Sequence, residues 1–247
     1  MTSESRQHID TDVVVIGGGP GGLQAALTLG RVRHDVVLFD AGLAHARNAR
    51  AVHLQNFVTR DGVPPAEFRR IAHQQLDTYK TVQRFEERVV EVSGAVDHFV
   101  VVSDRHRVTA RRVFLALGVV DELPPLAGIA DIWGDSSAQC PFCHGYEVGD
   151  RRLATYTPSA LHLEHAGMLI GWSRDVTALT NGEFVVDDAL RAHVAASGVV
   201  LDERRIARLD SVDRQLTQIV FDDGSSRAAD FLFTQTKQHQ TGVVQQL

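Results

Sequence analysis

The stretch that decides the fold is Asp12-Val-Val-Val-Ile-Gly-Gly-Gly-Pro-Gly-Gly22. Its β-branched run, residues 12–16, is typical of a strand buried inside a parallel sheet. Helical spacing of apolar residues follows over 23–30, and a second buried run occupies 35–40. A strand, a glycine-rich turn, a helix and a second strand in this order predict a βαβ unit, so we expect a chain of the α/β class.

The glycine-rich turn carries a ligand-binding pattern. Gly17, Gly19 and Gly22 fit G-x-G-x-x-G, and Asp40 ends the next strand. The first glycine permits the tight turn, the second lets the backbone approach a pyrophosphate, and the third allows the helix to pack closely on the strand. The start of the helix offers unpaired N–H groups to phosphates, and Asp40 can accept hydrogen bonds from a ribose. We therefore expect a bound dinucleotide here; the alternative is a glycine turn that holds no ligand.

The rest of the chain continues the α/β pattern. Residues 41–80 indicate a long polar, helical stretch, 88–102 and 107–117 indicate strands, and 119–128, with Pro124-Pro125, indicate a linker. A second series follows, with strands expected at 153–157, 175–180 and 199–202, helices at 160–172 and 186–197, and a hairpin within 208–234 that turns at Asp222-Asp223-Gly224. The last residues, 235–247, show no clear pattern. Two βαβ starts predict two related Rossmann-type domains, each of three layers.

Composition and charge exclude several classes of protein. The 247 residues are 44% hydrophobic and 23% charged, as in a soluble globular chain of one large domain or two of ordinary size. The net charge of -6 gives no reason to expect nucleic acid or an anionic membrane as a partner. No apolar run is long enough to span a bilayer, and residues 1–10 lack the apolar core of a signal peptide. We therefore expect a cytoplasmic protein.

The two cysteines of the chain, Cys140 and Cys143, form a C-x-x-C pair. Because the cytosol keeps thiols reduced, the pair is not expected to be a structural disulfide. The spacing suits thiol–disulfide exchange, since one thiolate attacks a disulfide while the second lies close enough to resolve the mixed intermediate. A place at a helix N-terminus would lower the thiol pKa. His144 follows directly and could move protons.

Haem attachment, zinc binding and an inert buried pair remain alternative roles for the cysteines. Cys140-Pro-Phe-Cys143-His144 also fits the C-x-x-C-H pattern of c-type haem attachment, which normally needs export. Zinc needs about four ligands, and no second C-x-x-C exists. The cysteines could be inert and buried, and His144 could have only a structural role. We expect no metal site: His162, Glu164 and His165 are more typical of a solvated helix face than of metal ligands.

A glycine fingerprint near the N-terminus followed by a distant C-x-x-C resembles the thioredoxin-reductase family of FAD-dependent disulfide oxidoreductases. Leu115-Ala116-Leu117-Gly118 is similar to the Ala-Thr-Gly motif of that family, with Leu117 in place of threonine, and Trp133-Gly134 precede the cysteines as in many relatives. The similarity is greatest to a subgroup with Cys-x-x-Cys-His-Gly-Tyr-Glu, here Cys140 to Glu147, where typical members have aspartate after the second cysteine. This subgroup includes the dithiol oxidases of gliotoxin and holomycin biosynthesis.

The resemblance implies two Rossmann-type domains and a role for each site residue. Residues 1–120 would form an FAD-binding domain, 121–240 a pyridine-nucleotide-like domain that carries the cysteines, and 241–247 the start of a linker back to the FAD domain. Cys143 would face the flavin as the charge-transfer thiolate, Cys140 would exchange with the substrate, and His144 would be the acid/base. The residues expected to contact FAD are Gly17, Gly18, Gly19, Pro20, Gly21, Gly22, Asp40, Ala41, Arg47, Asn48, Val89, Ala116 and Gly118.

The chain departs from the family in two places. The turn of the second domain, Thr155-Tyr-Thr-Pro-Ser-Ala160, has no glycine, and the arginines that would grip a 2′-phosphate are missing after 179–182, so NADPH binding is doubtful. Family members also return to the FAD domain with a Gly-Asp-containing strand and a helix, whereas this chain stops at Leu247. We therefore expect a truncated FAD domain with weak flavin affinity and an exposed sheet edge.

These features predict an FAD-dependent oxidoreductase that exchanges electrons between the Cys140/Cys143 pair, the flavin and a thiol or disulfide substrate. The substrate would be a small dithiol or disulfide or a thioredoxin-like protein, and analogy suggests a homodimer. One alternative is a dithiol oxidase of a natural product that passes electrons to oxygen, which the missing second glycine motif favours. Another is a catalytically silent remnant that binds a partner or a nucleotide.

Overall fold

The computed structural model describes residues 6–247, which form two compact units. Unit 1 contains the chain up to His53 together with Gly62–Asp121 and Gln238–Leu247, and unit 2 contains Leu54–Asp61 and Glu122–Lys237. Two of the four places where the chain passes between the units carry the short strands β7 (Val120–Glu122) and β16 (Lys237–His239), which pair with each other. Which cofactor belongs to which unit stays a prediction.

Unit 1 contains a six-stranded sheet with the order β3-β2-β1-β6-β5-β4. Four of these strands are parallel, and β4 and β5 add an antiparallel meander. The strands are β1 (Gln7–Ile16), β2 (Val36–Asp40), β3 (Val82–Glu86), β4 (Val89–Ser93), β5 (Phe99–Ser103) and β6 (His106–Leu115).

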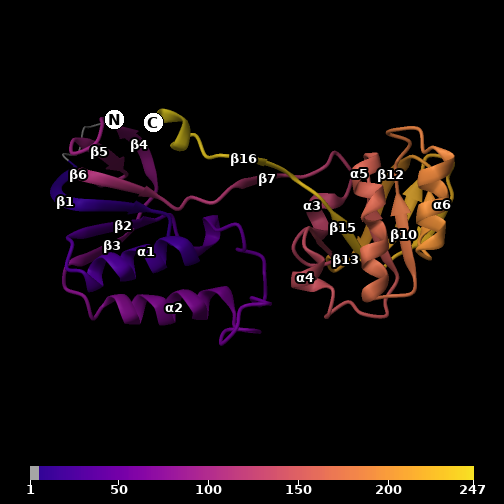
Figure 1. The fold of residues 1–247 in the computed structure, drawn as a ribbon, viewed down its shortest axis with the longest axis horizontal. Helices are drawn as coiled ribbons and strands as arrows, with labels where there is room; N and C mark the ends of the chain where they lie inside the picture. Colours follow the sequence, from indigo (N-terminus) through magenta and orange to yellow (C-terminus); the bar gives the residue numbers. More distant parts are fainter. Residues whose placement is uncertain (1–5) are drawn as a thin grey trace. The chain divides into compact units, whose positions relative to one another are not determined.

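The alternation of side chains along β1 explains the layers of unit 1. Val13 and Val15 pack in one cluster with residues of α1 (Pro20–Arg31) and α2 (Pro65–Leu76), which Figure 1 shows on one side of the sheet. Val14 and Ile16 point to the opposite face and pack with residues of the meander. Because successive side chains of a strand point to opposite faces, an unbroken apolar run builds both interfaces.

Half of β6 has an open edge. Residues 107–110 pair with β5, whereas Arg112 to Leu115 pair with β1 and, among the described residues, with no second strand. Phe114 is 46% exposed there.

A buried acidic group ties the meander of unit 1 together. Glu87, between β3 and β4, accepts hydrogen bonds from Ser103 Oγ at 2.6 Å, His106 Nδ1 at 3.0 Å and Arg105 Nε at 2.9 Å. Burial raises the pKa of the Glu87 carboxyl, but the hydrogen bonds and the charge of His106 outweigh it and hold the pKa at about 2. The cluster therefore favours an ionised carboxylate.

Unit 2 has a five-stranded parallel sheet with the order β11-β10-β9-β15-β8. Its helices α5 (Ala160–Glu164) and α6 (Asp188–Ala196) share one core cluster with the sheet, and α3 (Ile129–Ile132) shares a second cluster with the antiparallel strands β12 to β14. Each unit is thus layered on both faces of its sheet, which confirms the predicted fold class. The strands are β8 (Ser137–Ala138), β9 (Leu153–Tyr156), β10 (Val176–Leu179), β11 (Val200–Asp202), β12 (Ile206–Val212), β13 (Gln215–Phe221), β14 (Ser226–Ala228) and β15 (Phe231–Thr234).

Some predicted elements are wrong in extent. Of residues 41–80, only the 3₁₀ turn η1 (Leu43–His45) and α2 are helical, because Pro64-Pro65 set a late helix start; β3 follows unpredicted. The helix expected at 160–172 is α5 followed by the 3₁₀ segment η2 (Ala166–Gly171). Gly167 is a weak helix former, and it lies so close to Ser197 that a Cβ would come within 2.9 Å.

The ends of the chain also differ from the predictions. The polar leader expected at residues 1–10 lies partly outside the described residues, and β1 already begins at Gln7. The turn predicted at 222–224 joins β13 to β14, while a second turn at Asp213-Arg214 joins β12 to β13. The final stretch forms β16 and the 3₁₀ turn η3 (Val244–Gln246). Within residues 6–247, no helix combines the length and apolar character needed to cross a bilayer.

Candidate active site

The glycine-rich turn of unit 1 leaves an open cradle at the start of α1. A Cβ on Gly17 would lie 2.3 Å from Ala116 O, and one on Gly22 would lie 1.8 Å from Gly17 O. In contrast, a Cβ on Gly19 or Gly21 would meet nothing within 4 Å. Gly17 and Gly22 therefore serve close packing, while the space over Gly19 is free for a ligand to approach the backbone.

The first turn of α1 suits a phosphate. Gly19 is the N-cap and Pro20 follows it, with no side-chain cap and no acidic residue in the first turn. The helix is 12 residues long, so its N-terminal N–H groups and dipole favour an anion. The residues present thus fit the pyrophosphate of a dinucleotide.

Asp40 ends β2 directly over this turn. A Cβ on Gly18 would lie 2.2 Å from Asp40 Oδ2, so the absence of a side chain at Gly18 makes room for the carboxylate. Arg69 from α2 forms a salt bridge with Asp40 Oδ2, and the side chains of both residues are largely buried. The glycine pattern points to Asp40, but nothing in the helical pattern of α2 singles out Arg69.

The other residues predicted to contact FAD occupy different surroundings. Ala116 N donates to Ile16 O at 2.8 Å, which holds the end of β6 beside the glycine turn, and Gly118 has a φ of +65° with open space around its Cα. Arg47 Nη2 donates to Asp121 at 2.9 Å. Val89 belongs to the core, so its side chain faces away from solvent. Ala41 and Asn48 are half-buried, in the segment after β2.

The cysteine pair lies in unit 2. Cys140 follows β8 after one residue and is the N-cap of α4 (Pro141–His144), which contains Cys143. The two Sγ atoms are 2.8 Å apart, and both cysteines are half-buried free thiols. The C-x-x-C spacing, with one cysteine at the cap and the other inside the first turn, therefore places the sulfurs in contact.

The thiol pKa differs from the sequence expectation at Cys143. Burial raises the pKa of the Cys143 thiol, and contact with Cys140 raises it further, to about 11. The expected lowering by a helix N-terminus does not prevail, because α4 is only four residues long and its dipole is small. In this dithiol form, the Cys143 thiol is protonated at neutral pH.

His144 and Gly145 complete the motif. The His144 ring lies 6.2 Å from the Phe231 ring, and its Nδ1 is buried with no hydrogen-bond partner among the described residues. A Cβ on Gly145 would lie 2.6 Å from Pro141 O and 2.7 Å from Trp172 Nε1. Trp172 also contacts Phe142 edge-on, with ring centroids 5.5 Å apart. Sequence reasoning missed this packing role of Gly145 and Trp172.

The turn after β9 does not fit a second dinucleotide. Thr157 N donates to Leu179 O at 2.8 Å, and Pro158 has no N–H, so neither is available to a phosphate. Ser159 Oγ is 2.7 Å from His162 Nδ1 instead of capping α5, which is five residues long. Among the described residues, no group of three His, Cys, Asp or Glu is arranged to hold a metal.

Residues 11–236 match the family described as pyridine nucleotide-disulphide oxidoreductase. A "Probable thioredoxin reductase" from Arthroderma benhamiae is 36% identical over 187 residues, which cover 72% of this chain and 46% of that protein. "Thioredoxin reductase sirT" from Leptosphaeria maculans is 32% identical over 241 residues, covering 90% and 72%. The crystal structure of an oxidoreductase from Agrobacterium tumefaciens is similar with a TM-score of 0.88 at 38% identity, covering 94% of this chain and 77% of that one.

The family match includes both the glycine turn of unit 1 and the cysteine pair of unit 2. The chain spans about half the length of the first of these relatives and about three quarters of the other two. With a profile match over most of its residues and two layered α/β units, the chain belongs to the pyridine nucleotide-disulphide oxidoreductase family.

Proposed function

We propose that this chain works as an FAD-dependent disulfide oxidoreductase in which Cys140 and Cys143 exchange electrons with the flavin and with a thiol or disulfide substrate. The observation that carries the proposal is the 2.8 Å contact between the two Sγ atoms at the start of α4. Two thiols at this distance can close a disulfide with little backbone movement, as a redox pair requires. The names of the relatives, thioredoxin reductases, support the same chemistry.

In this proposal FAD binds to unit 1. The open backbone at Gly19 and the first turn of α1 would hold its pyrophosphate, and Asp40 would accept from a ribose hydroxyl. The salt bridge with Arg69 would hold the Asp40 carboxylate in place. When bound, FAD supplies an acceptor or donor for an electron pair.

The cysteines and His144 divide the remaining work. Cys140, at the cap of α4, would attack or release the substrate sulfur, and Cys143 would close the disulfide and face the flavin. The raised pKa of Cys143 means that a base has to remove its proton, or return it, at each turnover. His144 follows Cys143 and has a buried Nδ1 without a partner among the described residues, which supports its role as that acid/base.

NADPH is not part of the proposal. The turn after β9 has no glycine, its Thr157 N–H is bonded to Leu179 O and its Pro158 has no N–H, which favours a dithiol oxidase that uses oxygen over a reductase. We also propose a cytoplasmic protein that forms homodimers, on the family relationship. Light scattering after gel filtration measures the oligomeric state.

Turnover with a small dithiol tests the proposed function. With FAD supplied, we expect dithiothreitol to drive oxygen uptake that is lost in Cys140→Ser and in Cys143→Ser. NADPH oxidation with a disulfide acceptor should stay at background. Oxygen uptake that persists unchanged in the two serine variants would contradict the proposal. NADPH oxidation that depends on the cysteines would show that the chain is a reductase and not an oxidase.

A further inference from the structure

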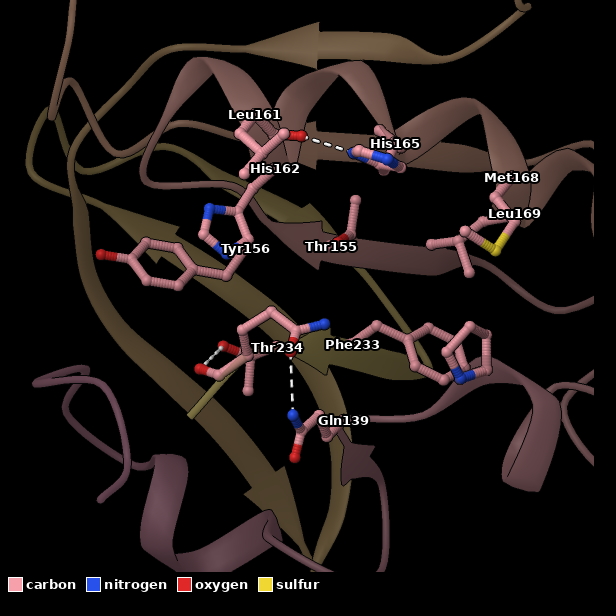
Figure 2. A pocket seen from close by; sticks show the side chains of 13 residues that line it. Gln139, Thr155, Tyr156, Leu161, His162, His165, Met168, Leu169, Phe233 and Thr234 are labelled. Atoms are coloured by element: carbon pink, nitrogen blue, oxygen red, sulfur yellow. Dashed lines mark hydrogen bonds between the residues drawn. The ribbon is translucent and has the colours of Figure 1, made fainter. Parts of the chain in front are cut away.

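Unit 2 contains a cavity of about 290 Å³ at the carboxyl ends of β9 and β15. Figure 2 shows the labelled side chains that surround it, which come from β9, α5, η2, β15 and the residue before Cys140. The largest of the apolar groups in its wall are those of Tyr156, Leu161, Met168, Leu169 and Phe233. Gln139, His162 and Thr234 add polar groups.

The position of the cavity follows from the strand order. In β11-β10-β9-β15-β8, the chain runs outward from β9 through β10 to β11 and later returns to β15 on the other side of β9, so the crevice between β9 and β15 is a topological switch point. Ligands of open α/β sheets bind in this crevice, outside the carboxyl ends of the strands. The location is therefore that of a ligand site, although the turn after β9 has lost the chemistry for a pyrophosphate.

The wall of the cavity selects the class of ligand. No lysine, arginine, aspartate or glutamate is among the described residues that line it. A volume of about 290 Å³ lies at the low end of the range for small-molecule pockets, which is about 300 to 1,000 Å³. A dinucleotide with its phosphates has neither the charge nor the size for such a site. A small, uncharged and largely aromatic molecule suits the cavity in both charge and size.

The same strand edge carries the cysteine pair. Because β8, β15 and β9 are parallel neighbours, their carboxyl ends meet at one edge of the sheet. Cys140 follows β8 after one residue and is the N-cap of α4, and the residues on either side of it, Gln139 and Pro141, line the cavity. Gln139 is fixed there by a 2.9 Å hydrogen bond from its Nε2 to Gln235 Oε1. A molecule in the cavity thus borders the segment that presents the reactive sulfur.

We infer that this cavity binds the small-molecule substrate of the cysteine pair, an uncharged, largely apolar disulfide or dithiol. This inference rests on the proposed function, since it uses Cys140 and Cys143 as a redox pair. The exchange balances without another reactant. The Cys140 thiolate attacks one sulfur of the bound disulfide and releases the other as a thiolate; the Cys143 thiolate then attacks Cys140 Sγ, releases the second substrate thiolate and leaves the protein disulfide. The two thiol protons of the protein pass to the two substrate thiolates.

Two aromatic disulfides, one uncharged and one dianionic, test the inference. The full chain is reduced, freed of reductant under anaerobic conditions and mixed with uncharged 4,4′-dithiodipyridine or with dianionic 5,5′-dithiobis(2-nitrobenzoate). Each rate is divided by the rate of that probe with free dithiothreitol, which removes intrinsic reactivity. We expect saturation with the uncharged probe and a preference for it of at least about tenfold. Equal normalised rates without saturation would overturn the inference.

Two variants that each introduce an arginine test whether the cavity is the binding site. Leu161→Arg places a cation in the wall of the cavity at a residue that is already 63% exposed, and it should abolish both the saturation and the preference. Val185→Arg is the matched control, because Val185 is 93% exposed and does not line the cavity. If both variants behave like the unmodified chain, or both lose the preference, the cavity is not the site.

A binding measurement separates this inference from the proposed function. Calorimetry with 1,2-di(4-pyridyl)ethane, which has carbon in place of both sulfurs, is carried out on Cys140→Ser/Cys143→Ser. Binding that Leu161→Arg removes and Val185→Arg retains supports the cavity even if the cysteines fail to reduce a flavin. Absence of binding, together with cysteine-dependent flavin reduction in the unmodified chain, would overturn the inference and leave the proposed function standing.

Discussion

Gly17 and Gly19 lie two residues apart in one turn, but a side chain would meet very different surroundings at each. Gly17 has a φ of +110° and would place a Cβ 2.3 Å from Ala116 O. Gly19 has a φ of -76° and ψ of -179°, which any residue adopts, and open space beyond its Cα. The first glycine is therefore required by the fold, whereas the backbone and packing at the second would accept a side chain, and we propose that its glycine serves the approach of FAD.

This contrast predicts different losses from the same substitution. Gly19→Ala should leave the free energy of unfolding unchanged without FAD and weaken FAD binding by about tenfold or more, since a methyl group occupies the path of the pyrophosphate. Gly17→Ala should destabilise unit 1 itself by about 1–3 kcal/mol. Urea unfolding and fluorescence titration with FAD measure the two effects. Unaltered FAD affinity in Gly19→Ala would show that the cradle does not hold the cofactor.

The site residues were predictable from sequence where a local pattern carries the geometry. The G-x-G-x-x-G spacing, the acidic residue after the next strand and the C-x-x-C spacing each define contacts within a few residues or one strand pairing. Arg69 was not predictable, because its salt bridge with Asp40 depends on how α2 docks. The raised pKa of Cys143 was missed as well, since the short length of α4 and the burial of the thiol come from tertiary packing.

At the scale of elements, the end of α4 packs closely against Trp172 at Gly145. Gly145 follows α4 at a place where a Cβ would lie 2.7 Å from Trp172 Nε1 and 2.6 Å from Pro141 O. Gly145→Ala should therefore displace Trp172 or α4, destabilise unit 2 by about 1–3 kcal/mol and shift the tryptophan emission. Gly171→Ala, with nothing within 4 Å of the new Cβ, is the matched control and should change neither. Equal behaviour of both variants would refute the packing role.

The meander of unit 1 should unfold in acid through Glu87. In the folded state the pKa of the Glu87 carboxyl is about 2, below the usual 4.5. The ionised carboxylate therefore stabilises the folded state more than the protonated carboxyl does. The resulting stabilisation, about 3 kcal/mol, is complete above about pH 5 and is lost as the pH falls towards 2. Urea unfolding between pH 7 and pH 3 should show a clear decrease for the unmodified chain and a flatter profile for Glu87→Gln.

The exposed Glu91 on β4 provides the control for that measurement. Glu91→Gln should retain the pH profile of the unmodified chain, because its carboxylate is not buried in the cluster of Ser103 and His106. A profile for Glu87→Gln as steep as that of the unmodified chain would assign the acid sensitivity to other groups.

Element prediction failed where the local pattern competes with packing. The predicted helix at 160–172 has apolar spacing throughout, but it divides into α5 and a 3₁₀ segment at which Gly167 approaches Ser197. β3 lacks strong alternation and forms because β2 offers it a parallel partner. The long β-branched runs of β1 and β2 were predictable because a strand buried on both faces has little alternative.

At the scale of the whole molecule, the two units divide the proposed chemistry. Unit 1 carries the cradle that suits FAD, and unit 2 carries the cysteines proposed as the redox pair together with a cavity whose described lining has no lysine, arginine, aspartate or glutamate. The repeat of βαβ starts predicted two Rossmann-type domains from sequence. The apolar cavity was not predictable, because its walls come from segments as distant as Gln139 and Gln235.

Electron exchange between FAD and the Cys140/Cys143 pair is the step on which the proposed function depends. The most direct measurement is an anaerobic titration of the full chain, supplied with FAD, by a small dithiol while the flavin absorbance is recorded. We predict bleaching of the flavin with a long-wavelength charge-transfer band in the unmodified chain. Cys143→Ser should lose the band, and Cys140→Ser/Cys143→Ser should lose both band and bleaching. No bleaching in the unmodified chain, or bleaching that is unchanged in the double variant, would contradict the account.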